Sequence, residues 1–222
     1  MDWPLAINRN RDALRRIVAA LFALTGLKIG GSLSTLPRHV YAAVMLVLRP
    51  AESAVRRLIT LAAHGLVLQP QAPHAAPVGL APREGSARKP AFALLDPLKQ
   101  FDPDAIWDAD APMFIEVHGP FDPAFGFHEV PSSLAPVAAN LLGLRLNALM
   151  RALDDLPRQA RRLVRWQARR DLALAQMRPM RLSPIRPGPP PGKRQRPLHE
   201  VDDILRECHG LALDRLNAPD TS

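Results

Sequence analysis

The segment from Arg145 to Arg181 constrains the fold of this chain more than any other, because apolar residues repeat along it with the period of an α-helix. Spacings of four and three residues alternate, which places seven apolar side chains on one side of a helix. They are Leu142, Leu146, Leu149, Leu153, Leu156, Ala160 and Leu163. The pattern predicts a long amphipathic helix within residues 138–181, with this leucine stripe as its apolar side.

The other side of the predicted helix is rich in arginine. Ten arginines against three acids give residues 145–181 a surplus of +7, in a protein whose net charge is +8. Five of these arginines lie within an arc of roughly 60° on a helical wheel, along about 27 Å of helix. We call them the arginine ridge: Arg151, Arg158, Arg162, Arg165 and Arg169. Because each guanidinium offers a planar fork of donors to paired oxygens, the ridge predicts a binding surface for an anionic partner.

Two further residues in this segment bear on that interpretation. Pro157 removes a backbone donor, so we expect either a kink there or a second helix that begins at Asp155-Leu156-Pro157. Trp166 lies at the border between the two sides, where an indole packs on its neighbours or stacks on a nucleic-acid base. The alternative is a plain solvated helix face, because 25 of the 29 basic residues in the chain are arginine.

The first 68 residues predict an apolar helical bundle. We expect helices at residues 10–26, 37–48 and 50–65, with breaks at Gly30-Gly31 and at Arg49-Pro50. Charged residues precede the apolar runs, an order also found in membrane-associated segments and signal peptides. The apolar run that ends the first helix is shorter than the roughly 20 residues of a membrane span. A bundle buried within the protein is therefore favoured over membrane association or secretion.

Proline-rich sequence separates the remaining elements. Residues 69–91 carry five prolines and no apolar periodicity, which predicts a disordered linker. Residues 182–198 predict a second, basic linker in the extended polyproline conformation, which serves as a spacer, a ligand for an aromatic groove or a basic arm on phosphates. Residues 199–222 predict a short C-terminal amphipathic helix. It carries the single cysteine, Cys208, which we expect to be a buried, inert thiol.

Residues 92–137 differ from the rest of the chain in charge and in aromatic content. They hold eight acids against Lys99 alone, together with six of the seven phenylalanines. We expect an acidic, aromatic-rich insertion with a small β-hairpin that pairs residues 113–119 with residues 126–130. Such a segment suits a protein partner. A second hypothesis is that it folds back on the arginine ridge and competes with an outside polyanion.

One cluster in the predicted hairpin combines imidazoles with carboxylates: Glu116, His118, His128 and Glu129. These are ligands that catalytic zinc uses, but their spacing matches no zinc motif, and His128-Glu129 lacks the second histidine of an HExxH helix. No nucleophile elbow, phosphate-binding glycine loop or dinucleotide fingerprint occurs in the chain. We therefore expect no metal, no cofactor and no catalytic residue, and a metal-dependent enzyme is the third choice of function.

Together these features predict a mostly α fold: an N-terminal helical bundle, the acidic insertion, the long arginine-rich helix and Pro-rich linkers. The predicted function is a non-enzymatic, cytoplasmic interaction protein that engages an anionic partner, nucleic acid first, through the ridge and Trp166. The alternative is a peripheral or membrane-anchored scaffold with its N-terminal helices at an anionic bilayer, because basic stripes are common to both classes.

Overall fold

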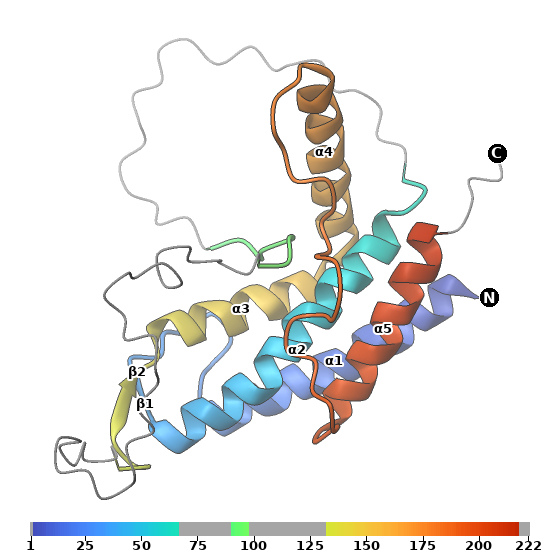
Figure 1. Cartoon of the computed structure of the whole chain (residues 1–222). Coiled ribbons are helices and arrows are strands. Elements are labelled where there is room, and N and C mark those ends of the chain that lie inside the picture. Colours follow the sequence, from blue (N-terminus) through green and yellow to red (C-terminus); the bar gives the residue numbers. More distant parts are fainter. Residues whose placement is uncertain (1, 67–89, 98–131, 218–222) are drawn as a thin grey trace, which may run out of the picture.

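The computed structural model describes residues 2–66, 90–97 and 132–217. These parts of the chain form helices and one small antiparallel sheet (Figure 1). In order they are α1 (Trp3–Thr25), β1 (Thr35–Pro37), α2 (Arg38–Ala63), β2 (Pro136–Ala138), α3 (Asn140–Asp154), α4 (Leu156–Ala175) and α5 (Glu200–Asn217). The predicted mostly α fold is confirmed.

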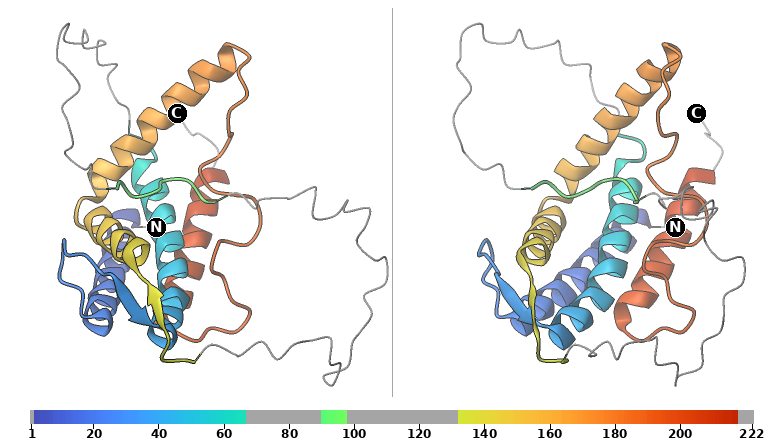
Figure 2. Two further views of the ribbon diagram at one scale, coloured as in Figure 1. Left: turned by 90° about the vertical axis from the view of Figure 1, so that its left-hand side faces the viewer. Right: turned by 60° about the vertical axis from the view of Figure 1, so that its left-hand side comes forward.

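Helix α2 lies at the centre of the fold. All four other helices contact it, and Figure 2 shows them arranged around it. Every residue from Pro50 to Leu61 is buried, including several polar and charged side chains. The leucine stripe packs into the same core, and all seven of its predicted members are buried. The helical period therefore identified the core side of α3 and α4 correctly.

The N-terminal helix begins earlier than the sequence pattern indicates. Asp2 accepts a hydrogen bond from the Leu5 amide at 3.0 Å, and a proline follows in the first turn. A capping carboxylate and an early proline both favour helix initiation, so α1 starts at Trp3 and not near Asn10. It ends before Gly26, whose φ of 66° terminates the helix in the left-handed conformation.

The expected break at Arg49-Pro50 is wrong, because α2 continues through Pro50 as one helix. A proline inside a helix leaves the carbonyl four residues earlier without its donor. Here that carbonyl belongs to Leu46, and the Arg194 guanidinium donates to it from the Pro-rich segment. The chain thus supplies from a distant position the hydrogen bond that Pro50 cannot make.

Gly192 lies directly against this part of α2. Its φ is 84°, and a Cβ at this position would come within 2.7 Å of the Pro50 nitrogen. We expect Gly192→Ala to lower the free energy of unfolding by about 1–3 kcal/mol, through backbone strain and steric overlap. Urea denaturation measures the change. Gly188→Ala is the matched control, because Gly188 has a φ of 79° but open space around its Cβ. Equal effects of the two substitutions would show that the contact with Pro50 is unimportant.

Asp155 separates α3 from α4. Of the two outcomes expected at Pro157, a second helix is observed and not a kink within one helix. The backbone of Asp155 leaves the helical region with φ −129° and ψ 61°, and its side chain accepts from the Arg158 amide at 3.1 Å. Leu156 and Pro157 then begin α4. Arg151 therefore lies on α3, whereas the rest of the arginine ridge lies on α4.

The second Pro-rich segment, which was predicted as an extended basic linker, makes specific contacts with the folded chain. Residues 182–198 contain no helix or strand, but they pack against the helices. Ile185 is buried, and Pro184 accepts a hydrogen bond from the Asp96 amide at 2.9 Å. Contacts to neighbouring elements, and not internal regularity, hold this segment in place.

The small sheet pairs β1 with β2, with Leu36 opposite Val137. These strands are not the ones predicted for the hairpin, residues 113–119 and 126–130, which lie outside the described residues. Residues 69–89 of the first predicted linker also lie outside them. None of the helices in the described ranges combines the length and the apolar character that crossing a membrane requires.

Candidate anion-binding surface

Three members of the arginine ridge converge on one groove. Arg151 from α3 and Arg158 and Arg162 from α4 line a cavity of about 380 Å³, together with residues 90–92. Two acids also line it, but both are engaged elsewhere: Asp154 pairs with Arg15 of α1 at 3.1 Å, and Asp155 caps α4. Arg151, Arg158 and Arg162 therefore lie close together although the helix is interrupted at Asp155.

The arginines of the groove bind neutral acceptors. Arg151 donates to the carbonyls of Asn147 at 3.1 Å and Pro90 at 2.9 Å. Arg162 donates to the Gln159 side chain and, at 3.4 Å, to the Phe92 carbonyl. Burial, followed by the neighbouring Arg158 charge, lowers the pKa of Arg162 from its usual value. Neutral acceptors orient a guanidinium but do not cancel its charge, so the groove stays electropositive.

The remaining ridge residues lie further along α4, which projects beyond the other helices (Figures 1 and 2). Arg165 and Arg169 are exposed and lie on the same side of the helix as Arg158. Within the described residues, none of these three makes an ion pair with a carboxylate, whereas Arg170 pairs with Asp171 at 2.6 Å. Helix α4 carries six arginines and one acid. Its outer face therefore holds a dense positive charge that the described parts of the chain do not neutralise.

Trp166 is engaged within the protein. Its indole is half-buried and packs against the core, and the Arg170 guanidinium lies 5.7 Å from its ring centroid. This geometry corresponds to the packing role that the sequence allows for this residue. Stacking of Trp166 on a base stays a prediction.

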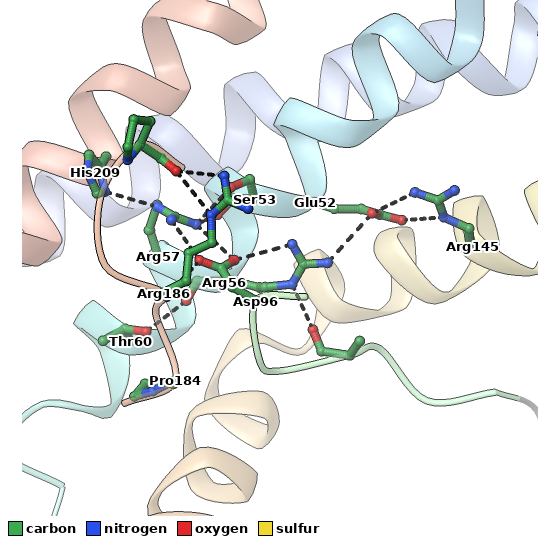
Figure 3. Close-up of polar contacts among 12 residues, drawn as sticks. Glu52, Ser53, Arg56, Arg57, Thr60, Asp96, Arg145, Pro184, Arg186 and His209 are labelled. Atoms are coloured by element: carbon green, nitrogen blue, oxygen red, sulfur yellow. Dashed lines mark hydrogen bonds and ion pairs between the residues drawn. The ribbon is translucent and has the colours of Figure 1, made fainter. Parts of the chain in front are cut away.

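Sequence reasoning missed a buried ion pair between α2 and the first residues of the acidic insertion. Arg57 and Asp96 are both fully buried side chains, joined by two hydrogen bonds of 2.8 and 3.2 Å (Figure 3). Arg57 also donates to the Ser53 hydroxyl at 2.7 Å, and the Arg186 amide donates to Asp96 at 3.3 Å. The pair thus connects α2 with two segments that have no regular secondary structure.

The same network continues to α3. Arg56 lies 3.5 Å from Asp96 and 3.6 Å from Glu52, and Glu52 accepts two hydrogen bonds of 2.8 Å from Arg145. The hydrogen bonds that Arg145 donates to Glu52 raise the pKa of Arg145, whereas burial lowers the pKa of Arg56. Arg145, Arg56 and Arg57 therefore hold the fold together and do not belong to the exposed positive surface.

This network contains residue types of nucleophilic catalysis, but not their geometry. His209 accepts a hydrogen bond from the Arg57 Nε at 3.2 Å through its Nδ1, and burial followed by the Arg57 charge lowers the pKa of His209. Arg57 thus lies between His209, Ser53 and Asp96. A guanidinium does not give up its proton in proteins, so it cannot relay one from a serine to a histidine. The arrangement is a structural clamp.

Two of the sequence hypotheses depend on residues that the structure does not describe. Glu116, His118, His128 and Glu129 lie outside the described residues, and within the described ranges no three metal-ligating side chains are grouped to hold a metal. Of the acidic insertion, Phe92 lies beside the arginines of the groove, but the one carboxylate of residues 92–97, Asp96, pairs with α2. Competition between the acidic insertion, residues 92–137, and a polyanion stays a prediction.

Comparison with known proteins gives no match to a protein-family model, to a curated protein or to a solved structure.

Proposed function

We propose that this protein is a non-enzymatic, cytoplasmic interaction protein that binds a polyanion, nucleic acid first, through α4. The observation that carries the proposal is the charge of the outer face of this helix. Arg158, Arg165 and Arg169 are exposed there without a carboxylate partner among the described residues. Uncompensated cations in one row cost electrostatic self-repulsion, which an anionic partner relieves.

Nucleic acid fits the row better than a small anion does. Positions 158, 162, 165 and 169 repeat along more than two turns of helix, so they meet an extended partner with regularly spaced charges. Phosphate contacts of this kind release counterions and make the affinity fall steeply with salt. The groove formed with Arg151 adds a further cation beside the first turn of α4.

The test removes the three exposed arginines together, as Arg158→Gln, Arg165→Gln and Arg169→Gln. We expect the affinity for a labelled single-stranded or duplex oligonucleotide to fall by about 10- to 100-fold at low salt. The slope of log affinity against log salt concentration should become shallower by about 2 to 3, because each lost phosphate contact accounts for roughly 0.7 to 0.9 of slope. Fluorescence anisotropy across a salt series measures both quantities.

The matched control removes the same charge from α1 and α5, as Arg9→Gln, Arg16→Gln and Arg206→Gln. These side chains are exposed on other helices and already pair with Glu207, Glu200 and Asp203 respectively. We expect an affinity close to that of the unchanged protein. If both triple variants lose affinity equally, net charge and not the α4 face is responsible, and the proposal for α4 is wrong.

The membrane alternative takes a different form in the folded chain. The apolar residues of α1 that were expected at a bilayer, such as Leu14, Val18 and Leu21, are buried in the core. The exposed large apolar side chains near the basic end of α4 favour that end as the contact with lipid: Leu172, Met177, Met180 and Leu182. Sedimentation with anionic vesicles, together with no binding of oligonucleotide, is the result that favours this second candidate.

A further inference from the structure

A second basic groove lies on a different part of the molecule, between the first half of α2, β2 and the Pro-rich segment. The groove is open to solvent and has a volume of about 570 Å³. Four cations line it: Arg38, Arg49, Lys193 and Arg194. Its other lining residues are uncharged, and six of them are apolar or aromatic: Tyr41, Ala42, Met45, Leu46, Pro50 and Val137. We call it the α2 groove. None of the arginine ridge belongs to it.

The described contacts fix the shape of the α2 groove. Gly192 lies against Pro50, and Arg194 is anchored by the Leu46 carbonyl and by Asp202, which is 3.1 Å from its guanidinium. These contacts hold the backbone of Lys193 and Arg194 against α2. The α2 groove therefore forms where residues 192–194 pack on α2, more than a hundred residues earlier in the sequence, and no local motif predicts it.

The two kinds of lining define the chemistry that the groove accepts. Arg38, Arg49 and Lys193 are exposed and make no ion pair with a described residue, so they are available for a phosphate. Tyr41 is half-buried beside them and provides a flat apolar surface. The volume is in the range of small-molecule sites, about 300–1,000 Å³. We propose that the α2 groove binds a nucleoside phosphate, with the phosphates on the cations and the base on Tyr41.

The test is equilibrium binding of a fluorescent nucleoside diphosphate, methylanthraniloyl-ADP, to the full chain. Changing Arg38, Arg49 and Lys193 together to Gln should weaken binding at least about tenfold, because each loses a charge-assisted hydrogen bond. Tyr41→Ala should weaken binding several-fold, whereas Tyr41→Phe should retain it, because stacking needs the ring and not the hydroxyl. Arg38, Arg49 and Lys193 are exposed, whereas Tyr41 also packs against the core, so circular dichroism is used to establish that each variant keeps its helices.

Competition separates the two parts of the ligand. Unlabelled ADP should displace the probe, and pyrophosphate and adenosine should each displace it more weakly. Pyrophosphate that competes as well as ADP would show that only the phosphates are recognised and would overturn the nucleoside part. The Arg158, Arg165 and Arg169 triple variant is the second control and should bind the probe normally. Loss of probe binding in that variant, or none in the α2-groove variant, would overturn the site without touching the proposal for nucleic acid on α4.

Discussion

Replacing Asp96 with alanine is expected to lower the free energy of unfolding by about 3–5 kcal/mol, the usual result of leaving a buried charge unpaired. The Arg57 side chain has no exposed surface, and Asp96 holds it with two hydrogen bonds. The substitution would also remove the Asp96 carboxylate that lies 3.5 Å from Arg56, which would keep only Glu52. Chemical denaturation followed by circular dichroism measures the change.

An exposed ion pair of the same residue types is the control. Asp154 pairs with Arg15 at 3.1 Å, with both side chains about half exposed. Asp154→Ala should therefore change the free energy of unfolding by about 0–1 kcal/mol. The double variant Arg57→Met with Asp96→Ala should be less destabilised than the sum of the single variants, because removing both partners leaves no buried charge. Strict additivity would contradict the importance of the pair.

The apolar pattern carried most of the information about helices. A stripe of seven residues with helical spacing is redundant, because each member independently fixes the same side, and every one of them is buried. An interruption at Pro157 was also readable, as either a kink or a new helix, and Asp, Leu and Pro in that order favour the new helix start that is observed. Local signals of this kind are complete within a few residues, so a single sequence is sufficient to recover them.

The continuity of α2 through Pro50 could not be predicted, because it depends on contacts between residues far apart in the chain. Pro50 is a local signal for a break, but the donor that satisfies the Leu46 carbonyl is on Arg194. The charges at Arg56 and Arg57 resembled the basic flank of an apolar run, yet their carboxylate partner is Asp96, in a segment classed with the acidic insertion. Each of these compensations joins residues distant in the chain, and such pairs leave no periodicity to detect.

The candidate surface shows the same division. Helical spacing correctly placed Arg158, Arg162, Arg165 and Arg169 on one side of α4. It gave no indication that Arg145 turns inward to Glu52 at 2.8 Å, or that the Pro90 carbonyl would accept from Arg151. The sequence thus identifies which arginines share a face, while the ion pairs that remove some of them from the exposed charge require the folded chain.

Cys208 should react with iodoacetamide at about pH 8 at least about a thousandfold more slowly in the folded protein than in the unfolded chain. Burial, followed by the charge of Glu207, raises the pKa of this thiol from 9.0 to about 12. Only the thiolate reacts, and at that pH the fraction of Cys208 in the thiolate form falls about tenfold for each unit by which the pKa rises. The side chain is also fully buried, which agrees with the inert thiol expected from the sequence. Mass spectrometry of samples alkylated with and without denaturant measures the ratio.

The same thiol makes stability depend on alkaline pH. Because its pKa is higher in the folded chain, its contribution is intact below the unfolded value of 9.0 and is lost as the pH rises from there toward 12. Between about pH 8 and about pH 10.5, the protein should lose roughly 2 kcal/mol more stability than Cys208→Ala, which has no thiol to ionise. Other groups titrate alike in both proteins and cancel in the comparison. If the unchanged protein and Cys208→Ala lose stability in parallel, the pKa of Cys208 is not raised by folding. Rapid alkylation of the folded protein would show that the thiol is accessible, and a nucleophilic role would then have to be reconsidered.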